Sequence, residues 1–380
     1  MAAPLICASI WISCDDQPSR KLKKVDQMIW EVKQNYAPDS RVAIFDVQAT
    51  ESDHSILLTG FSDQPTGLKS LVDSIASRGY RVSNQVRVLP DSTVGDQLFA
   101  VVNNSVGNMR SKPRHSAELA TQVLMGTIVK VKRIEGEWYQ VQSPDGYIAW
   151  IDHGGVELMT ASDAVSWKNA DKIIVTNLVT TAKKGIWTQA VVSDLVLGNK
   201  LKLLGKEEKY FEVEYPDGRK GFVHTRDAKR YFDWKSELES SPELVENFAR
   251  KLLGTPYLWG GTSTKGMDCS GFTKTVYMMN GMVIPRDASQ QVNSGNPVDE
   301  GNDFENLQKG DLVFFGKFAT DSTRKKTTHV GIWLGNKEFI HSSQQVRISS
   351  FDQESDYYDE ENLARYLEAR RYLGTTVPFY

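Results

Sequence analysis

The chain has 380 residues, of which 40% are hydrophobic and 24% are charged, a composition typical of globular proteins long enough for two or three domains. Its formal net charge of −3 argues against a nucleic-acid partner, because no basic excess is available to neutralise phosphates. The three cysteines are Cys7, Cys14 and Cys269, which excludes a disulfide framework in the body of the chain.

The N-terminus carries a short apolar run from Leu5 to Ser13 that ends at Cys14, after which the composition turns polar. Residues 1–14 are therefore interpreted as an export signal of the lipoprotein type. The pattern is incomplete, because Trp11 stands three residues before Cys14 and no Lys or Arg precedes the run. We expect a location in the cell envelope, either periplasmic or attached to the membrane through a lipid on Cys14.

Residues 20–95 predict a small α+β module. Apolar residues recur at helical spacing near its start and again from Leu68 to Ile75. Three stretches alternate as strands do, and they are Val42 to Val47, Ser55 to Phe61 and Tyr80 to Leu89. Nothing in this module carries chemistry, so we interpret it as a spacer or a partner surface.

The middle of the chain contains an internal repeat. Motifs recur in the same order at one constant offset: Gln122 to Gly126 as Asp194 to Gly198, Trp138-Tyr139 as Tyr210-Phe211, and Pro144-Asp145-Gly146 as Pro216-Asp217-Gly218. Each copy predicts short strands around a Pro-Asp-Gly turn, which suits a small closed β-barrel. Both copies resemble bacterial SH3-like domains, and we call residues 96–160 the first repeat and residues 161–230 the second repeat.

The two repeats differ where a ligand would be held. Tyr147 of the first repeat corresponds to Arg219 of the second, and Glu118 lies in the long first loop of the first repeat. Two identical binding modules would be expected to keep the same polar groups. The first repeat is therefore expected to do something that the second does not.

A linker is expected from Arg230 to Pro242, followed by a catalytic domain over residues 240–380. Ser241 suits the N-cap of a helix over 243–253, and Pro242 suits its first position.

Cys269 is the candidate nucleophile. Gly260, Gly261 and Gly266 precede it in what we expect to be a flexible loop, and apolar residues then recur at helical spacing, so Cys269 should lie in the first turn of a buried helix. The unpaired N–H groups and the dipole at a helix start favour a thiolate, which is the reactive form. An inert buried cysteine is the alternative for a thiol without further context.

The context is a pair of histidines. His329 and His341 stand in alternating runs joined by Leu334-Gly335-Asn336-Lys337, a predicted hairpin turn, so one hairpin could present both rings to one thiol. A cysteine nucleophile needs a base, and a third polar group that orients the base. A zinc site with one cysteine and two histidines is the alternative. That alternative gives no role to Tyr257 or to Asp268, the residue directly before Cys269.

Several motifs in one order resemble the NlpC-type cell-wall cysteine peptidases over roughly residues 240 to 373. They are Thr255 to Gly261, Asp268 to Phe272, Pro285-Arg286 with Gln291, Gly310 to Phe315, His329 to Ile332, His341-Ser342 and Ala369 to Arg371. The resemblance implies a papain-like α+β fold with Cys269 as nucleophile, His329 as general base and His341 as the orienting group. It also implies that Tyr257 points into the site and helps to stabilise the oxyanion.

Two further positions bear on the substrate. Asp268, directly before the nucleophile, is placed to pair with a cation or to cap the helix, and Ser270 adds a hydroxyl. With two SH3-like domains, the chain resembles the γ-D-glutamyl-L-diamino-acid endopeptidases, which act on wall peptides with a free N-terminal L-alanine. That resemblance implies that the alanine amine is held by Asp268, Ser270 and Tyr147, and by Glu118 as a weaker match.

The expected fold is thus multidomain, with an N-terminal α+β module, two small SH3-like β-barrels and a papain-like catalytic domain. The expected function is hydrolysis of the bond between γ-D-Glu and a diamino acid in peptidoglycan-derived peptides, without a cofactor or a metal. Two alternatives remain: an amidase or acyltransferase that uses the same site on another amide, and a wall-binding protein with an inactive peptidase domain.

Overall fold

The computed structural model describes residues 19–52, 55–299 and 303–375, and the chain divides into two compact units between Leu89 and Pro90. The expected export signal, with Cys7 and Cys14, lies outside the described residues. Among the residues described, no helix is both long and apolar enough to cross a membrane.

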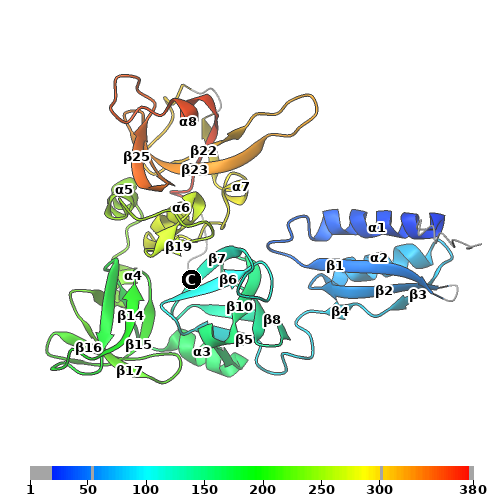
Figure 1. Ribbon diagram of the computed structural model, residues 1–380, viewed down its shortest axis with the longest axis horizontal. Helices are drawn as coiled ribbons and strands as arrows, with labels where there is room; N and C mark the ends of the chain where they lie inside the picture. Colours follow the sequence, from blue (N-terminus) through cyan, green and yellow to red (C-terminus); the bar gives the residue numbers. More distant parts are fainter. Residues whose placement is uncertain (1–18, 53–54, 300–302, 376–380) are drawn as a thin grey trace, which may run out of the picture. The chain divides into compact units, whose positions relative to one another are not determined.

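The N-terminal unit is a small sheet covered by two helices (Figure 1). Its elements are α1 Arg20–Tyr36, β1 Phe45–Ser52, β2 Ser55–Ser62, α2 Pro65–Ala76, β3 Arg81–Asn84 and β4 Arg87–Val88. β1 pairs antiparallel with β2, whereas β3 and β4 both run parallel to it. Alternate residues of β2, among them Ile56 and Leu58, are buried against the apolar faces of both helices. The predicted element order is confirmed, except that the last strand is broken in two.

The internal repeat is confirmed strand for strand. The first repeat contains β5 Phe99–Val102, β6 Val106–Arg110, β7 Leu119–Leu124, β8 Ile128–Glu135, β9 Trp138–Gln142, β10 Ile148–Asp152 and β11 Val156–Met159. The second contains β12 Lys172–Val175, β13 Val179–Lys183, β14 Val191–Val196, β15 Lys200–Glu207, β16 Tyr210–Glu214, β17 Lys220–His224 and β18 Ala228–Arg230. The sheet orders, β11-β5-β8-β9-β10-β6-β7 and β18-β12-β15-β16-β17-β13-β14, correspond at every position.

Three helical segments adjoin the repeats. The 3₁₀ turn η1 (His153–Gly155) and α3 (Ala161–Asn169) follow β10 and β11. The expectation of a plain linker from Arg230 to Pro242 is wrong, because it contains α4 (Tyr231–Ser236), whose Trp234 is buried in the core of the C-terminal region. Ile174 and Leu197 of the second repeat join the same core. An apolar contact therefore continues from the second repeat into the C-terminal region.

The C-terminal region is built on one six-stranded antiparallel sheet, ordered β21-β26-β22-β23-β24-β25. Its elements are α5 Pro242–Lys251, β19 Thr262–Ser263, β20 Gly266–Met267, α6 Cys269–Met279, α7 Ala288–Gln291, β21 Asn296–Asp299, β22 Leu312–Lys317, β23 Lys326–Gly335, β24 Glu338–Ser343, β25 Gln345–Ser350, α8 Glu360–Ala364 and β26 Tyr366–Arg371. α5 begins as predicted, with the Ser241 hydroxyl accepting from the N–H of Leu244.

The sheet separates two apolar layers. Leu312 and Phe314 of β22 face the core that contains α6, whereas Val313 and Phe315 face a second cluster with Trp333. α6 packs on β23 and β24 (Figure 1). The buried helix that begins at Cys269 therefore lies directly against the hairpin that carries both histidines.

Candidate active site

Cys269 is the first residue of α6, and its helix start is tightly packed. The Asp268 carboxylate caps the helix by accepting from the N–H of Gly271 at 2.7 Å and also accepts from the N–H of Gly260 at 3.0 Å. A Cβ on Gly260, where φ is +78°, would lie 2.1 Å from the Leu119 carbonyl oxygen. Gly260 therefore serves a close approach to the first repeat rather than the loop flexibility expected of it.

The thiol is held in a buried setting, with Cys269 only 8% exposed. Burial, followed by the charge of Asp268, raises the pKa of Cys269 to about 12, although N–H groups of Val330 and Ser270 oppose this. The helix start is predicted to favour a thiolate, whereas burial in the packed structure favours the neutral thiol. The N–H of Val330 follows His329 along β23, so its bond to the sulfur places the thiol beside the histidine strand.

The hairpin prediction is confirmed. β23 pairs antiparallel with β24 around a turn in which Asn336 and Lys337 both have positive φ, as a tight two-residue hairpin requires. His329 Nε2 lies 2.7 Å from His341 Nδ1, so the second ring is placed to orient the first. Both rings are buried, at 8% and 0% exposure.

Both histidines are neutral in this setting. Burial lowers the pKa of His329 well below its usual 6.5, assisted by His341, Arg365 and Arg347. Burial likewise lowers the pKa of His341 to about 4, although the charge of Asp359 opposes the change. The resting site therefore holds a neutral thiol and a neutral imidazole, which suits proton transfer to His329 during attack rather than a preformed ion pair.

Tyr257 reaches the same place from the loop before β19. Its pKa is raised first by burial, then by the negative charges that Cys269 and Asp268 carry when ionised. Within the described parts of the chain, its hydroxyl has no hydrogen-bond partner. Tyr257 is therefore near enough to Cys269 for the two groups to interact electrostatically, and its role in stabilising an oxyanion stays a prediction.

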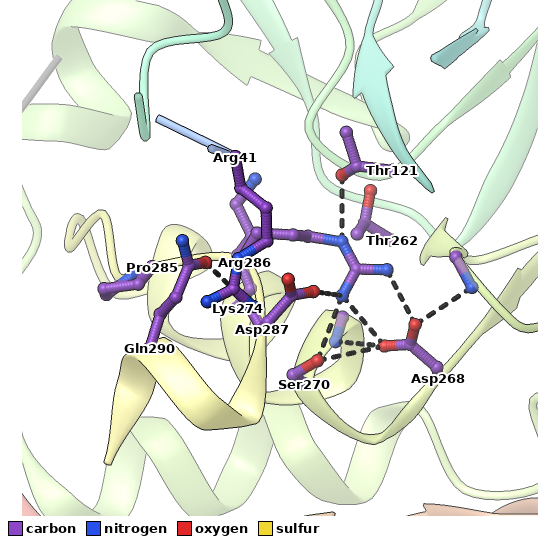
Figure 2. A network of polar contacts seen from close by, with 12 residues as sticks. Arg41, Thr121, Thr262, Asp268, Ser270, Lys274, Pro285, Arg286, Asp287 and Gln290 are labelled. Atoms are coloured by element: carbon purple, nitrogen blue, oxygen red, sulfur yellow. Dashed lines mark hydrogen bonds and ion pairs between the residues drawn. The ribbon is translucent and has the colours of Figure 1, made fainter. Parts of the chain in front are cut away.

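Asp268 is already paired with a cation of the protein itself (Figure 2). Arg286, 1% exposed, donates to both carboxylate oxygens at 3.0 and 2.7 Å, and also to the Ser270 hydroxyl at 3.0 Å. Burial alone would lower the pKa of Arg286, but Asp268 raises it, with smaller effects from Asp287 and Tyr147. Asp268 thus caps the helix and carries an internal ion pair, and it shares the Arg286 guanidinium with the Ser270 hydroxyl, while Tyr147 lies near enough to influence the pKa of Arg286.

The first repeat packs, through β7, on the loop and helix around Cys269. Thr121 accepts from Arg286 Nε at 2.9 Å, and Gln122 takes hydrogen bonds from the backbone of Thr262 at 2.9 Å and from the hydroxyl of Ser263 at 3.0 Å. On the turn that precedes Tyr147, Asp145 forms an ion pair of 2.5 Å with Lys274 of α6.

The second repeat uses its Pro-Asp-Gly turn differently. Asp217, which corresponds to Asp145, pairs with Arg219 of its own turn at 2.6 Å. The divergence between the two repeats in the sequence thus matches a structural difference, because the turn of the first repeat forms an ion pair with α6.

Glu118 is exposed and lies farther out than the other predicted substrate residues. Its carboxylate accepts from the indole N–H of Trp259 at 2.7 Å, and the Trp259 side chain is itself 64% exposed. Glu118 therefore stands with Trp259 at the solvent side of the contact between the first repeat and the Tyr257 loop.

Sequence reasoning missed four residues. Arg286 stands in the Pro285-Arg286 motif, whereas Lys274 and the two residues beyond the histidine pair, Ser349 and Asp359, belong to no motif in the sequence. Only the Pro-Arg motif offered a signal for any of them. For the zinc alternative, the described residues contain no group of three His, Cys, Asp or Glu placed to hold one metal ion.

The fold and the site together define a class of protein. Residues 254–366 match the NlpC/P60 family, and residues 109–155 match the bacterial dipeptidyl-peptidase Sh3 domain. A curated relative is 30% identical over 84% of this chain and 95% of its own length. The chain belongs to the NlpC/P60 family.

That relative is the γ-D-glutamyl-L-lysine dipeptidyl-peptidase of Bacillus cereus. A protein of the same name from Bacillus subtilis is 32% identical over 59% of this chain and 72% of its own length. Among solved structures, an NlpC/P60 family protein from Bacillus cereus superposes with a TM-score of 0.61 at 25% identity, covering 72% of this chain and 99% of that one.

Proposed function

We propose that this protein is a cysteine endopeptidase of peptidoglycan turnover that cuts between γ-D-Glu and a diamino acid in peptides with a free N-terminal L-alanine. The relatives named γ-D-glutamyl-L-lysine dipeptidyl-peptidases support this substrate class. The observation that carries it is the contact of the first repeat with the Arg286 guanidinium shared by Asp268 and Ser270: Thr121 of that repeat accepts from Arg286, and Tyr147 is near enough to influence its pKa. Activity on wall peptides, together with the export signal expected to end at Cys14, supports the cell envelope as location.

The proposed mechanism begins with a neutral thiol. His329 takes the proton as the Cys269 sulfur attacks the γ-glutamyl carbonyl carbon, and the imidazolium that forms is stabilised by His341. The Tyr257 hydroxyl donates to the oxyanion of the tetrahedral intermediate. His329 then returns the proton to the leaving amine, and water hydrolyses the thioester with His329 again as base.

In this proposal the amine of L-alanine is held beside the first repeat. Tyr147 and Ser270 accept from the ammonium, Asp268 offsets the positive charge of the adjacent Arg286 guanidinium, and Glu118 attracts the ammonium from the solvent side. Because Arg286 already neutralises Asp268, removing the ammonium leaves no unpaired buried carboxylate. Acetylating the amine should therefore lower kcat/KM only by the contribution of the ammonium's own hydrogen bonds. It should not add the further penalty that an unpaired Asp268 would bring.

The test compares kcat/KM for L-Ala-γ-D-Glu-diamino-acid tripeptides with a free and an acetylated amine, with the products identified by mass spectrometry. Loss of a charge-assisted hydrogen bond is worth about 1.5–3 kcal/mol, or roughly ten- to a hundredfold in kcat/KM. Equal values for the two tripeptides would refute recognition of the amine. Cleavage at another amide of the peptide would favour the amidase or acyltransferase alternative.

Variants separate the amine pocket from general damage to the first repeat. Tyr147→Phe should lower kcat/KM for the free-amine tripeptide and narrow the preference over the acetylated one. Tyr139→Phe, in the same repeat but near Glu157 and Asp152, is the matched control and should leave both values unchanged. Asp268 is a poor probe, because its removal also uncaps α6 and leaves Arg286 buried without its partner.

A further inference from the structure

The histidine pair does not end at His341. On the far side of that ring, Nε2 lies 3.1 Å from the hydroxyl of Ser349 on β25. The carboxylate of Asp359, the N-cap of α8, lies close enough to Ser349 for the Ser349 side chain to lower its pKa. A continuous polar chain therefore runs from His329 through His341 and Ser349 to Asp359, with Ser349 3% and His341 0% exposed.

Asp359 is firmly held at the end of this chain. Its two carboxylate oxygens accept from the backbone N–H and the side-chain amide of Asn362, at 3.0 and 2.7 Å. Burial would raise the pKa of Asp359, but these bonds, together with Ser349 and His341, lower it. Asp359 is therefore ionised at neutral pH and can only accept hydrogen bonds.

Counting protons along the chain fixes each donor. The ionised Asp359 can only accept, so its charge directs the single hydroxyl proton of Ser349 toward it, and the Ser349 oxygen is left to accept from Nε2–H of His341. A neutral imidazole has one N–H, so Nδ1 of His341 is an acceptor and receives a hydrogen bond from the Nε2–H of His329. The remaining nitrogen of His329, Nδ1, then carries a lone pair and is the only ring nitrogen left for the thiol.

We infer that Ser349 and Asp359 are positioning residues that hold His329 in the tautomer able to accept the Cys269 proton. The opposite order of donors would put an N–H on Nδ1 of His329, and a ring in that state cannot act as the base. Two nearby arginines lower the pKa of both rings: Arg347, opposite His341 on β25, and Arg365, which follows α8. The rings therefore stay neutral and each keeps a single N–H. This inference deepens the proposed function, on whose Cys269 and His329 roles it rests.

The test uses ring-labelled ¹⁵N-histidine in the full chain, with the His329 and His341 signals assigned from His329→Ala and His341→Asn. Long-range ¹H–¹⁵N spectra distinguish protonated from unprotonated ring nitrogens. Both rings should carry their proton on Nε2 in the wild type. In Asp359→Asn the new amide keeps an oxygen to cap α8 and can donate to Ser349, so some or all of the His329 proton should move to Nδ1. A His329 proton on Nδ1 in the wild type would overturn the inference.

Kinetics provide the second readout. Ser349→Ala should lower kcat roughly five- to tenfold, the worth of one hydrogen bond, with KM unchanged. Asp359→Asn should lower kcat further, because its amide can reverse the direction of the hydrogen bonds along the chain, whereas Ser349→Ala only removes one bond. Ser350→Ala is the matched control, since that hydroxyl bonds to the Lys337 carbonyl oxygen and not to a histidine. Equal kcat in the Ser349 and Ser350 variants, with an unchanged His329 tautomer, would overturn the inference.

Alkylation of Cys269 by iodoacetamide separates this inference from the proposed substrate. The rate should fall in Ser349→Ala and Asp359→Asn even with no peptide present, because His329 assists removal of the thiol proton. If the wild type cleaves no γ-glutamyl peptide but shows the Nε2 tautomer and this pattern of alkylation, the proposed function fails while the positioning role stands.

Discussion

The ion pair between Asp145 and Lys274 tests whether the first repeat holds the catalytic helix. Asp145→Asn is nearly isosteric and keeps an oxygen for the N–H of Tyr147. The substitution replaces the carboxylate that faces Lys274 by an uncharged amide. In one orientation of this amide, its N–H groups point at the Lys274 ammonium. Burial raises the pKa of Asp145, but Lys274 and the bonds from Ser143 and Tyr147 outweigh this and lower it. The charged carboxylate is thus the form that the structure stabilises.

The expected loss follows from burial. Removing one partner of a buried ion pair costs about 3–5 kcal/mol, because the other charge is left without compensation. The Asp145 side chain is 1% exposed, whereas Lys274 keeps 18% and can turn partly toward water, which places the loss near the lower end, about 3 kcal/mol. That value corresponds to about a hundredfold change in the equilibrium for separating the turn from α6.

The second repeat supplies the matched control, Asp217→Asn. Its partner Arg219 is 42% exposed and Asp217 is 22% exposed, so this pair should contribute only about 0–1 kcal/mol. Both variants keep the same change of residue in the same Pro-Asp-Gly turn. Any difference between them therefore reports the contact with α6.

The assay is hydrogen exchange of the backbone, followed by mass spectrometry, together with kcat/KM on the free-amine tripeptide. Peptides that contain the N–H groups of Gly260 and Thr262, which bond to Asp268 and Gln122, should exchange faster in Asp145→Asn than in Asp217→Asn. In Asp145→Asn, the ratio of kcat/KM for the free-amine tripeptide to that for the acetylated one should also decrease. Equal exchange and equal selectivity in the two variants would refute the claim that this ion pair closes the site.

Three further predictions address the catalytic groups and their packing. Cys269→Ala and His329→Ala should each abolish hydrolysis with the fold intact by circular dichroism, whereas His341→Asn should keep a measurable fraction; full activity of Cys269→Ala would end the mechanism. Because the folded-state pKa of His341 is depressed to about 4, the stability that it contributes is present above pH 6.5 and is lost as pH falls toward 4, up to about 3 kcal/mol. Denaturant titrations should therefore show a shallower acid loss in His341→Asn. Gly260→Ala should separate the loop from the first repeat, since its Cβ would lie 2.1 Å from the Leu119 oxygen, and a wild-type melting temperature and kcat/KM would contradict that packing.

The sequence by itself determined the features that rest on local patterns. An apolar period after a polar cap placed Cys269 at a helix start, alternation around a short turn placed His329 and His341 on paired strands, and a constant offset revealed the repeat. Such patterns depend on neighbours along the chain, so they survive without knowledge of tertiary contacts. The same is true of the Ser241 cap that opens α5.

Only the tertiary structure decided how the polar groups pair and whether they are charged. Asp268 and Arg286, or Asp145 and Lys274, meet because separate elements pack together, and no spacing in the sequence specifies such contacts. The neutral state of Cys269 could not be predicted either, since a helix start favours the thiolate while exclusion of water favours the thiol, and only the packed structure shows that the second effect is larger.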